Sequence, residues 1–203
     1  MHRLFAAAAL IIALAEPALA HHPMGGRVPG SFTEGLLSGF GHPIIGLDHL
    51  AAVLAIGALA AAHRAGVALA LGYVVAMIVG VAVHLQGVTL TGAEFLVALS
   101  VILLGVLLAR KSVVQSGALI GLFALAGLLH GYALGESIIG AERAPLAAYL
   151  IGLTVIQSAI ALAAMYAAKF MLARREPLTL RLAGATIAGI GIAILVQQIL
   201  PAA

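Results

Sequence analysis

Six apolar stretches follow one another along the chain, and each is long enough to cross a membrane. They run from 43–62, 66–85, 93–109, 113–134, 145–168 and 180–200. At a rise of 1.5 Å per residue, a helix of about 20 residues spans the ~30 Å hydrocarbon layer of a bilayer. A chain that is 64% hydrophobic and 8% charged also lacks the polar surface that a soluble domain needs. The sequence therefore predicts an all-α membrane protein, a bundle of six transmembrane helices in the lipid bilayer.

The first 20 residues have the features of a bacterial export signal. Arg3 gives a positive start, residues 4–15 are apolar, and residues 18–20 form an Ala-x-Ala cleavage site. We expect cleavage after Ala20; the alternative is an uncleaved first helix, which leaves the rest of the topology unchanged. The predicted division is a signal peptide (1–20), a periplasmic N-terminal arm (21–42) and a six-helix transmembrane domain (43–203).

Basic residues orient the predicted helices. If the mature N-terminus lies outside, the inside loops contain Arg64, Arg110, Lys111, Lys169, Arg174, Arg175 and Arg181, and the outside segments contain Arg27 and Arg143. This distribution follows the positive-inside rule. It predicts a multi-pass protein of the bacterial inner membrane with the mature N-terminus and the C-terminus in the periplasm. The net charge of +3 then needs no nucleic-acid partner, and neither a nucleic-acid nor a nucleotide-binding motif occurs.

Ionisable side chains inside the predicted spans point to function, because each costs about 2.5–3.5 kcal/mol at mid-bilayer on insertion scales. In the predicted topology they gather near the outer ends of the helices, as His42, Asp48, His49, His84, Glu94, His130, Glu136 and Glu142. Imidazole combined with carboxylate suits Ni²⁺, Co²⁺ and Zn²⁺. The chain has no Cys, which excludes thiolate sites and disulfides. We expect a divalent metal ion as the substrate and no prosthetic group.

The motif HPIIGLDH at 42–49 carries the first candidate ligands. Pro43 suits the first position of a helix. On a straight helix His42 and His49 would lie on nearly one stripe, about 10.5 Å apart along the axis, too far for one ion to bridge. The two histidines then act as successive steps, or form one site only if the segment before Pro43 folds back. Asp48 either ligates the ion or orients His49.

The motif HGYALGES at 130–137 carries the next candidates. Its glycines can loosen the helix end and expose backbone carbonyls toward a cavity. His130 and Glu136 are six residues apart, so both would reach one ion only if the helix breaks. At the mature N-terminus, His21 and His22 form either a metal-capture arm or a solvated tail. The predicted metal ligands are His21, His22, His42, Asp48, His49, His130 and Glu136.

Gln157 and Ser158 lie in the middle of the stretch 145–168. Polar side chains at such a position either line a conduit or form hydrogen bonds between helices. The sequence leaves both interpretations open.

These motifs resemble those of the HupE/UreJ family of nickel and cobalt permeases. The resemblance rests on HPIIGLDH followed by LAAVLAIG, on HGYALGESIIGAE, and on the HHPMGG and APLAAYLIG runs, and it spans nearly the whole mature chain. It implies inner-membrane secondary transport of Ni²⁺, or Co²⁺ in some members, for hydrogenase, urease or cobalamin pathways. His42, Asp48 and His49 match the first family motif, and His130 opens the second. Some members place the acid of the second motif one position later, where this chain has Ser137.

Two other functions use the same residues. An intramembrane zinc hydrolase would hold Zn²⁺ with histidines and Asp48 to activate water, but no HExxH motif is present. A rigid three-ligand site with one open position would favour that function, whereas weak exchangeable sites would favour transport. A periplasm-facing metal sensor would need a signalling domain, and the sequence contains none. The predicted function is therefore a permease without catalytic residues, compatible with a homo-oligomer.

Overall fold

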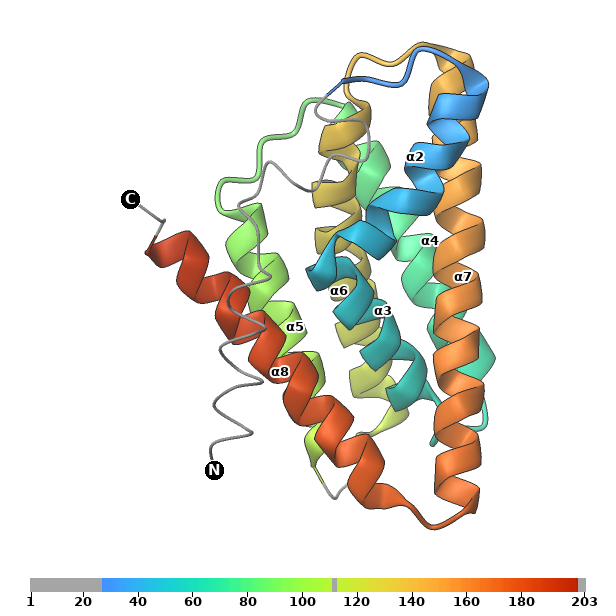
Figure 1. Cartoon of the computed structure of the whole chain (residues 1–203), viewed down its shortest axis with the longest axis vertical. Coiled ribbons are helices and arrows are strands. Elements are labelled where there is room, and N and C mark those ends of the chain that lie inside the picture. Colours follow the sequence, from blue (N-terminus) through green and yellow to red (C-terminus); the bar gives the residue numbers. More distant parts are fainter. Residues whose placement is uncertain (1–26, 111–112, 201–203) are drawn as a thin grey trace.

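The computed structural model describes residues 27–110 and 113–200, and all regular secondary structure in these residues is helical. In chain order the elements are α2 (Phe32–Ile45), α3 (Leu47–Ala60), α4 (Gly66–Leu85), α5 (Ala93–Ala109), α6 (Ser116–Gly135), the short 3₁₀ helix η2 (Glu136–Ile138), α7 (Arg143–Ala173) and α8 (Pro177–Ile199) (Figure 1). The predicted all-α class is confirmed. The predicted signal peptide and the histidines His21 and His22 lie outside the described residues.

Four of these helices are long and apolar enough to cross a membrane, namely α4, α6 with η2, α7 and α8. The pair α2 and α3 makes a fifth candidate span, bent by 77° at its break. The remaining apolar helix, α5, has 17 residues, or about 26 Å at 1.5 Å per residue, slightly less than the hydrocarbon thickness. The chain is therefore a multi-pass membrane protein. By length and composition its helices provide four or five membrane spans, compared with the six that were predicted.

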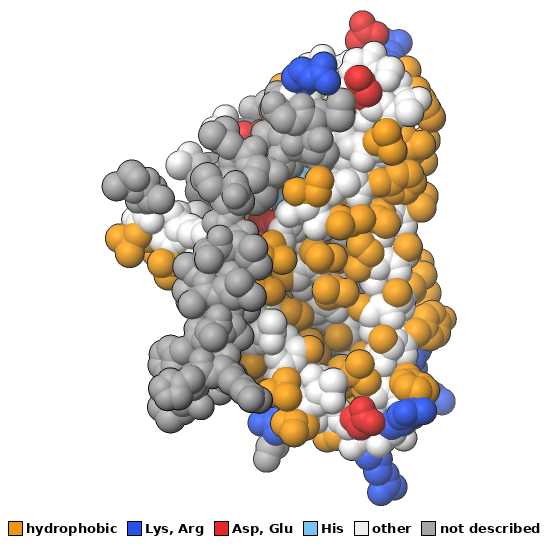
Figure 2. All heavy atoms as spheres, viewed as in Figure 1, with side chains coloured by type: hydrophobic (Ala, Val, Ile, Leu, Met, Phe, Trp, Pro, Cys, Tyr) orange, Lys and Arg blue, Asp and Glu red, His pale blue; other side chains and the backbone are white. Residues whose placement is uncertain are grey.

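The outer surface of the bundle is apolar across its middle. Figure 2 shows hydrophobic side chains over the central part of one face, with charged side chains gathered toward its two ends. Large apolar side chains such as Val75, Leu103, Leu125 and Ile151 are exposed, whereas His42, Asp48, His49 and other polar groups are buried. A soluble protein shows the reverse distribution, so this arrangement fits helices whose outer faces contact lipid.

The two ends of the bundle carry different charges. At one end, which we name the basic end, the C-terminus of α5 lies beside the N-terminal part of α8. There Arg181 Nε donates to the Ala109 carbonyl at 3.1 Å. The basic end carries Arg64, Arg110, Arg174, Arg175 and Arg181 in its loops and helix termini. The opposite end, which we name the acidic end, carries Glu34, Glu94, Glu136 and Glu142 together with Arg27 and Arg143. A hydrogen bond of 2.8 Å from the Leu90 N–H to the Tyr132 hydroxyl connects the loop between α4 and α5 to α6.

The predicted straight first span, beginning at Pro43, is wrong. Helix α2 begins at Phe32, where the Ser31 hydroxyl caps it by accepting from the Glu34 N–H at 3.2 Å. Pro43 lies inside α2, near its end, and has no N–H to donate to the preceding turn, which weakens the helix there. Gly46 then takes an extended conformation (φ −71°, ψ 102°) and α3 begins at the next residue. Residues 32–42, which were predicted to belong to the periplasmic arm, are therefore part of helix α2. This helix packs along α7 (Figure 1).

Glycines allow the helices to approach closely where they cross. Gly131 of α6 faces the Met77 carbonyl of α4 so closely that a side chain would collide with it. In the last span, Gly184 lies against Gly105 and Ala109 of α5, where small residues allow close helix contact. Gly189 of the same helix differs, because a Cβ added there would meet no atom within 4 Å.

Replacing Gly184 by alanine is expected to destabilise the protein, by about 1–3 kcal/mol as for other overpacked contacts. A Cβ at this position would lie 2.7 Å from the Gly105 carbonyl oxygen, so α5 and α8 would have to separate. Gly189→Ala in the same helix is the matched control, because it gains the same helix propensity without a clash. Thermal unfolding in detergent measures both. Equal unfolding temperatures for the two variants would contradict this packing.

Candidate metal-ion site within the bundle

The break at Gly46 brings the two histidines of the first motif together. The ring centroids of His42 and His49 are 5.8 Å apart, with the rings nearly perpendicular. The straight-helix spacing of about 10.5 Å, which favoured two successive steps, is therefore wrong. The helix bends by 77° at Gly46, which brings the two side chains together without the segment before Pro43 folding back. Gly46 itself is packed so tightly that an added Cβ would lie 2.8 Å from the His49 ring.

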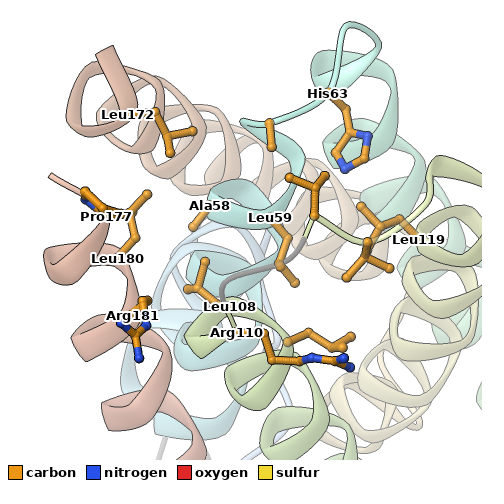
Figure 3. Close-up of a pocket in the computed structure, with 14 residues that line it drawn as sticks. Ala58, Leu59, His63, Leu108, Arg110, Leu119, Leu172, Pro177, Leu180 and Arg181 are labelled. Carbon is orange, nitrogen blue, oxygen red and sulfur yellow. The ribbon is translucent and has the colours of Figure 1, made fainter. Parts of the chain in front are cut away.

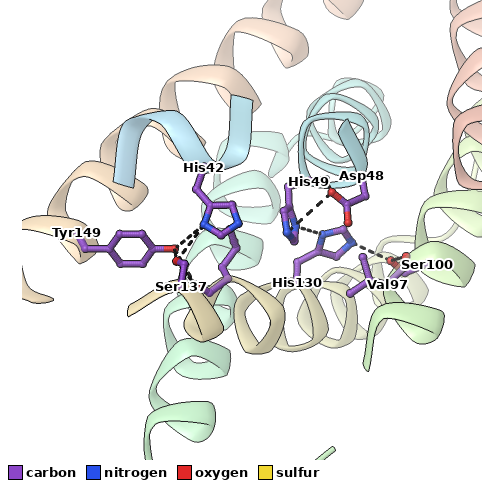
Figure 4. Close-up of polar contacts among 9 residues, drawn as sticks. His42, Asp48, His49, Val97, Ser100, His130, Ser137 and Tyr149 are labelled. Atoms are coloured by element: carbon purple, nitrogen blue, oxygen red, sulfur yellow. Dashed lines mark hydrogen bonds and ion pairs between the residues drawn. The ribbon is translucent and has the colours of Figure 1, made fainter. Parts of the chain in front are cut away.

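His130 completes a group of three imidazoles, drawn in Figure 4. It comes from α6 and is 0% exposed. Its Nδ1 lies 2.8 Å from His49 Nδ1, and its Nε2 lies 2.9 Å from the Ser100 hydroxyl. Ser100 donates its proton to the Val97 carbonyl at 2.7 Å, so it accepts from His130 Nε2–H. His130 Nδ1 then accepts from His49 Nδ1–H.

His42 is oriented from its other side by two hydroxyl groups. Its Nδ1 lies 3.0 Å from Ser137 Oγ and 3.4 Å from the Tyr149 hydroxyl. Both hydroxyls donate to the Leu134 carbonyl, at 3.1 and 2.7 Å, so their oxygens accept from His42 Nδ1–H. This tautomer leaves Nε2 as the nitrogen with the lone pair. A metal-ligating histidine is commonly held in this way, because the second bond fixes both ring and tautomer.

Asp48 contributes the carboxylate of the cluster. It lies in the first turn of α3 and is 7% exposed, the one buried carboxylate among residues 27–110 and 113–200. Its Oδ1 accepts from the His49 backbone N–H at 2.8 Å and lies 3.9 Å from His49 Nε2. A carboxylate at a helix N-terminus is stabilised by the helix dipole. With neutral imidazoles the cluster of His42, Asp48, His49 and His130, which we name the histidine cluster, has a charge of −1.

The remaining predicted ligands are not brought to this cluster. Glu136 is exposed in η2, at the acidic end, and the structure does not place it with His130. The helix end instead turns Ser137 inward, where it contacts His42. His84 and Glu94 also lie away from the cluster; the His84 ring packs on Tyr132, and Glu94 is exposed.

Sequence reasoning missed three groups that support the histidine cluster. Ser100 is a polar residue within the apolar stretch 93–109, and that contrast was the available signal. Tyr149 belongs to the APLAAYLIG run, but the run gives no reason to select it over its neighbours. Tyr73 packs against the His130 ring, with centroids 6.3 Å apart, and is 0% exposed.

The side chains of the histidine cluster are not spaced as a preset metal cage. In the described part of the chain, no group of three or more His, Cys, Asp or Glu side chains is spaced to hold a metal ion. The His49 and His130 nitrogens are instead bonded to each other. An ion would replace that hydrogen bond by two ligand bonds, and the bond would re-form when the ion leaves.

A cavity away from the histidine cluster has a different chemistry. It has a volume of about 380 Å³ and sits at the basic end, between the ends of α3, α5 and α7 and the start of α8 (Figure 3). Leu59, Leu108 and Leu180 line it together with Arg110 and Arg181. An apolar wall with two guanidinium groups repels a divalent cation, so this cavity is not a candidate metal site.

Comparison with known proteins agrees with the motifs of the chain. The family model described as "HupE / UreJ protein" matches residues 8–194. A curated relative, Protein HupE of Rhizobium leguminosarum bv. viciae, is 27% identical over 188 residues, which cover 92% of this chain and 95% of the relative. No solved structure gives a significant match. Because the family model covers most of the sequence, the chain belongs to the HupE / UreJ family.

Proposed function

We propose that this chain is a bacterial inner-membrane permease that takes up Ni²⁺, or alternatively Co²⁺, from the periplasm. The observation that carries the proposal is the histidine cluster, three imidazoles and one carboxylate buried inside a membrane bundle. Buried ionisable groups in a membrane are costly and mark ion pathways. The HupE / UreJ family is associated with nickel and cobalt uptake for hydrogenase and urease, which supports this choice of substrate.

The donor set favours a borderline divalent ion. Imidazole nitrogen with one carboxylate suits Ni²⁺, Co²⁺ and Zn²⁺, whereas Mg²⁺ and Ca²⁺ prefer oxygen ligands. The charge of −1 on the histidine cluster attracts a divalent cation, and the complex then carries a charge of +1. His42, held through Nδ1, offers Nε2 to the ion. Asp48 supplies the charge that offsets the loss of the ion's hydration.

In this proposal the acidic end faces the periplasm and the basic end faces the cytoplasm. The acids at the outer end raise the local concentration of divalent cations, and the arginines at the inner end follow the positive-inside rule. His21 and His22 would deliver the ion from the periplasmic side. A membrane potential gives a divalent ion about 4.6 kcal/mol per 100 mV, enough for roughly thousandfold accumulation.

Zinc-dependent hydrolysis is the competing chemistry, and the geometry favours it less. A catalytic zinc is held by three protein ligands with one open position for water. In the histidine cluster, two of the imidazoles are bonded to each other through their Nδ1 atoms. Exchangeable ligands of this kind suit passage of an ion better than permanent retention.

The test is nickel uptake by the purified chain in sealed lipid vesicles. Radioactive Ni²⁺ is added outside, with a potential imposed that is negative inside the vesicles. We expect uptake that saturates with Ni²⁺, exceeds that of protein-free vesicles and is abolished when the potential is dissipated. Uptake equal to that of protein-free vesicles at all potentials and pH gradients would contradict the proposal.

A further inference from the structure

Gln157 is a buried amide in the middle of α7 that the histidine cluster does not use. Its side chain is 0% exposed. Neither Oε1 nor Nε2 has a hydrogen-bond partner among the described residues. Inside a membrane bundle such a group is costly unless it is satisfied in some other state of the protein. The interhelical hydrogen bond left open by the sequence is not formed with any described residue.

The position of Gln157 follows from the helix contacts on either side of it. Four residues after it, the Ala161 carbonyl packs directly against Gly57 of α3. On α3, His49 precedes Gly57 by eight residues and lies on the same buried face. Gln157 lies one turn before Ala161 on α7, and Val53 lies one turn before Gly57 on α3. The contact between Ala161 and Gly57 therefore places Gln157 level with Val53. Gln157 is therefore about one turn, or ~6 Å, closer to the basic end than His49.

Tyr73 of α4 lies at a similar depth and also has an unsatisfied polar atom. Its hydroxyl is buried and has no hydrogen-bond partner among the described residues, although its ring packs against His130. Gly66, at the start of α4, packs against the Met165 sulfur of α7. Tyr73 is seven residues, ~10 Å, from Gly66, and Gln157 is eight residues, ~12 Å, from Met165 in the same direction. Two unpaired polar groups thus occur at one level, just beneath the histidine cluster.

We propose that Gln157, with Tyr73 at the same depth, forms a second binding step, which receives the divalent cation after it leaves the histidine cluster. This inference rests on the proposed function. A partly hydrated cation satisfies the two acceptor oxygens, since the amide Oε1 and the phenol oxygen accept from its water or bind it directly. Both ligands are neutral, so they hold the ion more weakly than a carboxylate with imidazoles does. Weak binding at this depth lets the ion continue toward the basic end.

The test variant is Gln157→Leu, which keeps the approximate volume and removes the amide. Nickel uptake into vesicles is expected to fall at least tenfold. Nickel affinity at the histidine cluster, measured by titration of the purified protein, should stay within about twofold. The unfolding temperature should be unchanged or higher, because an unpaired buried amide is lost. Gln86→Leu is the matched control, since Gln86 is exposed and bonds to its own helix at Ala82; its uptake should equal that of the wild type.

Three outcomes would overturn the inference. Wild-type uptake by Gln157→Leu with unchanged stability would show that the ion does not need the amide. A lower unfolding temperature, with uptake reduced only in proportion to folded protein, would show a structural role. If the wild-type chain neither binds nor carries Ni²⁺, the proposed function fails and the inference fails with it. The first two outcomes leave the proposed function intact, so the failures are distinguishable.

Discussion

Asp48→Asn is expected to reduce the initial rate of nickel uptake by between about thirtyfold and several thousandfold. Removing one partner of a buried charge pair costs about 2–5 kcal/mol, and each 1.4 kcal/mol is a factor of ten. The substitution is nearly isosteric and keeps an oxygen that can accept from the His49 N–H, the bond that Asp48 Oδ1 makes at 2.8 Å. The histidine cluster would lose its negative charge while α3 keeps its first turn. Uptake by reconstituted vesicles measures the effect.

The control for charge alone is Glu142→Gln, an exposed acid at the acidic end. We expect it to change uptake by less than twofold at physiological salt, because exposed charges are screened. The unfolding temperature of Asp48→Asn should not fall, since the buried charge has been removed. Equal uptake by Asp48→Asn and the wild type would show that this carboxylate does not bind the ion.

His49→Ala and His130→Ala are each expected to lower uptake by about 100-fold or more. Changing only an outer-shell partner of a metal ligand typically costs 10–100-fold, and each of these variants removes a proposed ligand itself. Each also removes the partner of the other imidazole, since their Nδ1 atoms are 2.8 Å apart. The two residues should therefore act as a unit, and the double variant should be little worse than the poorer single one.

His63→Ala is the control for loss of a histidine. His63 lies near the basic end, bonded to Ser116 at 3.0 Å, so its removal should leave uptake nearly unchanged. Multiplied losses in the double variant, approaching 10⁴-fold, would indicate independent binding steps. That result would show that the ion binds His49 and His130 in successive steps, and not together in one cluster.

The spans were predictable where apolar length alone decides the structure. The stretches 66–85 and 93–109 coincide with α4 and α5, since polar or glycine-containing loops bound them on both sides. Helices α7 and α8 begin before their predicted stretches, because the polar residues of their first turns do not interrupt a helix. The break at Gly46 was missed because Pro43 is equally suited to the start of a helix and to a weakened last turn. Local residue preference does not distinguish these two positions.

The histidine cluster was predictable in part. The cost of buried charge selected His42, Asp48, His49 and His130 from the sequence, and the structure brings these four together. Their mutual geometry depends on a 77° bend and on the place that α6 takes through its packing against α4 and α5, which are tertiary features. The choice of Glu136 depended on where α6 ends. The helix continues to Gly135, so the next turn directs Ser137 inward and leaves Glu136 exposed.

The most direct test of the account is X-ray absorption at the nickel edge on the purified protein with one equivalent of Ni²⁺. The chain should carry His21→Ala and His22→Ala, so that the N-terminus contributes no imidazole. We predict nickel bound to two or three imidazole nitrogens and at least one oxygen, with at most one imidazole, that of His42, remaining when His49 and His130 are also replaced by alanine. Nickel surrounded by oxygen alone, or a spectrum that the loss of His49 and His130 does not change, would contradict a metal site in the histidine cluster.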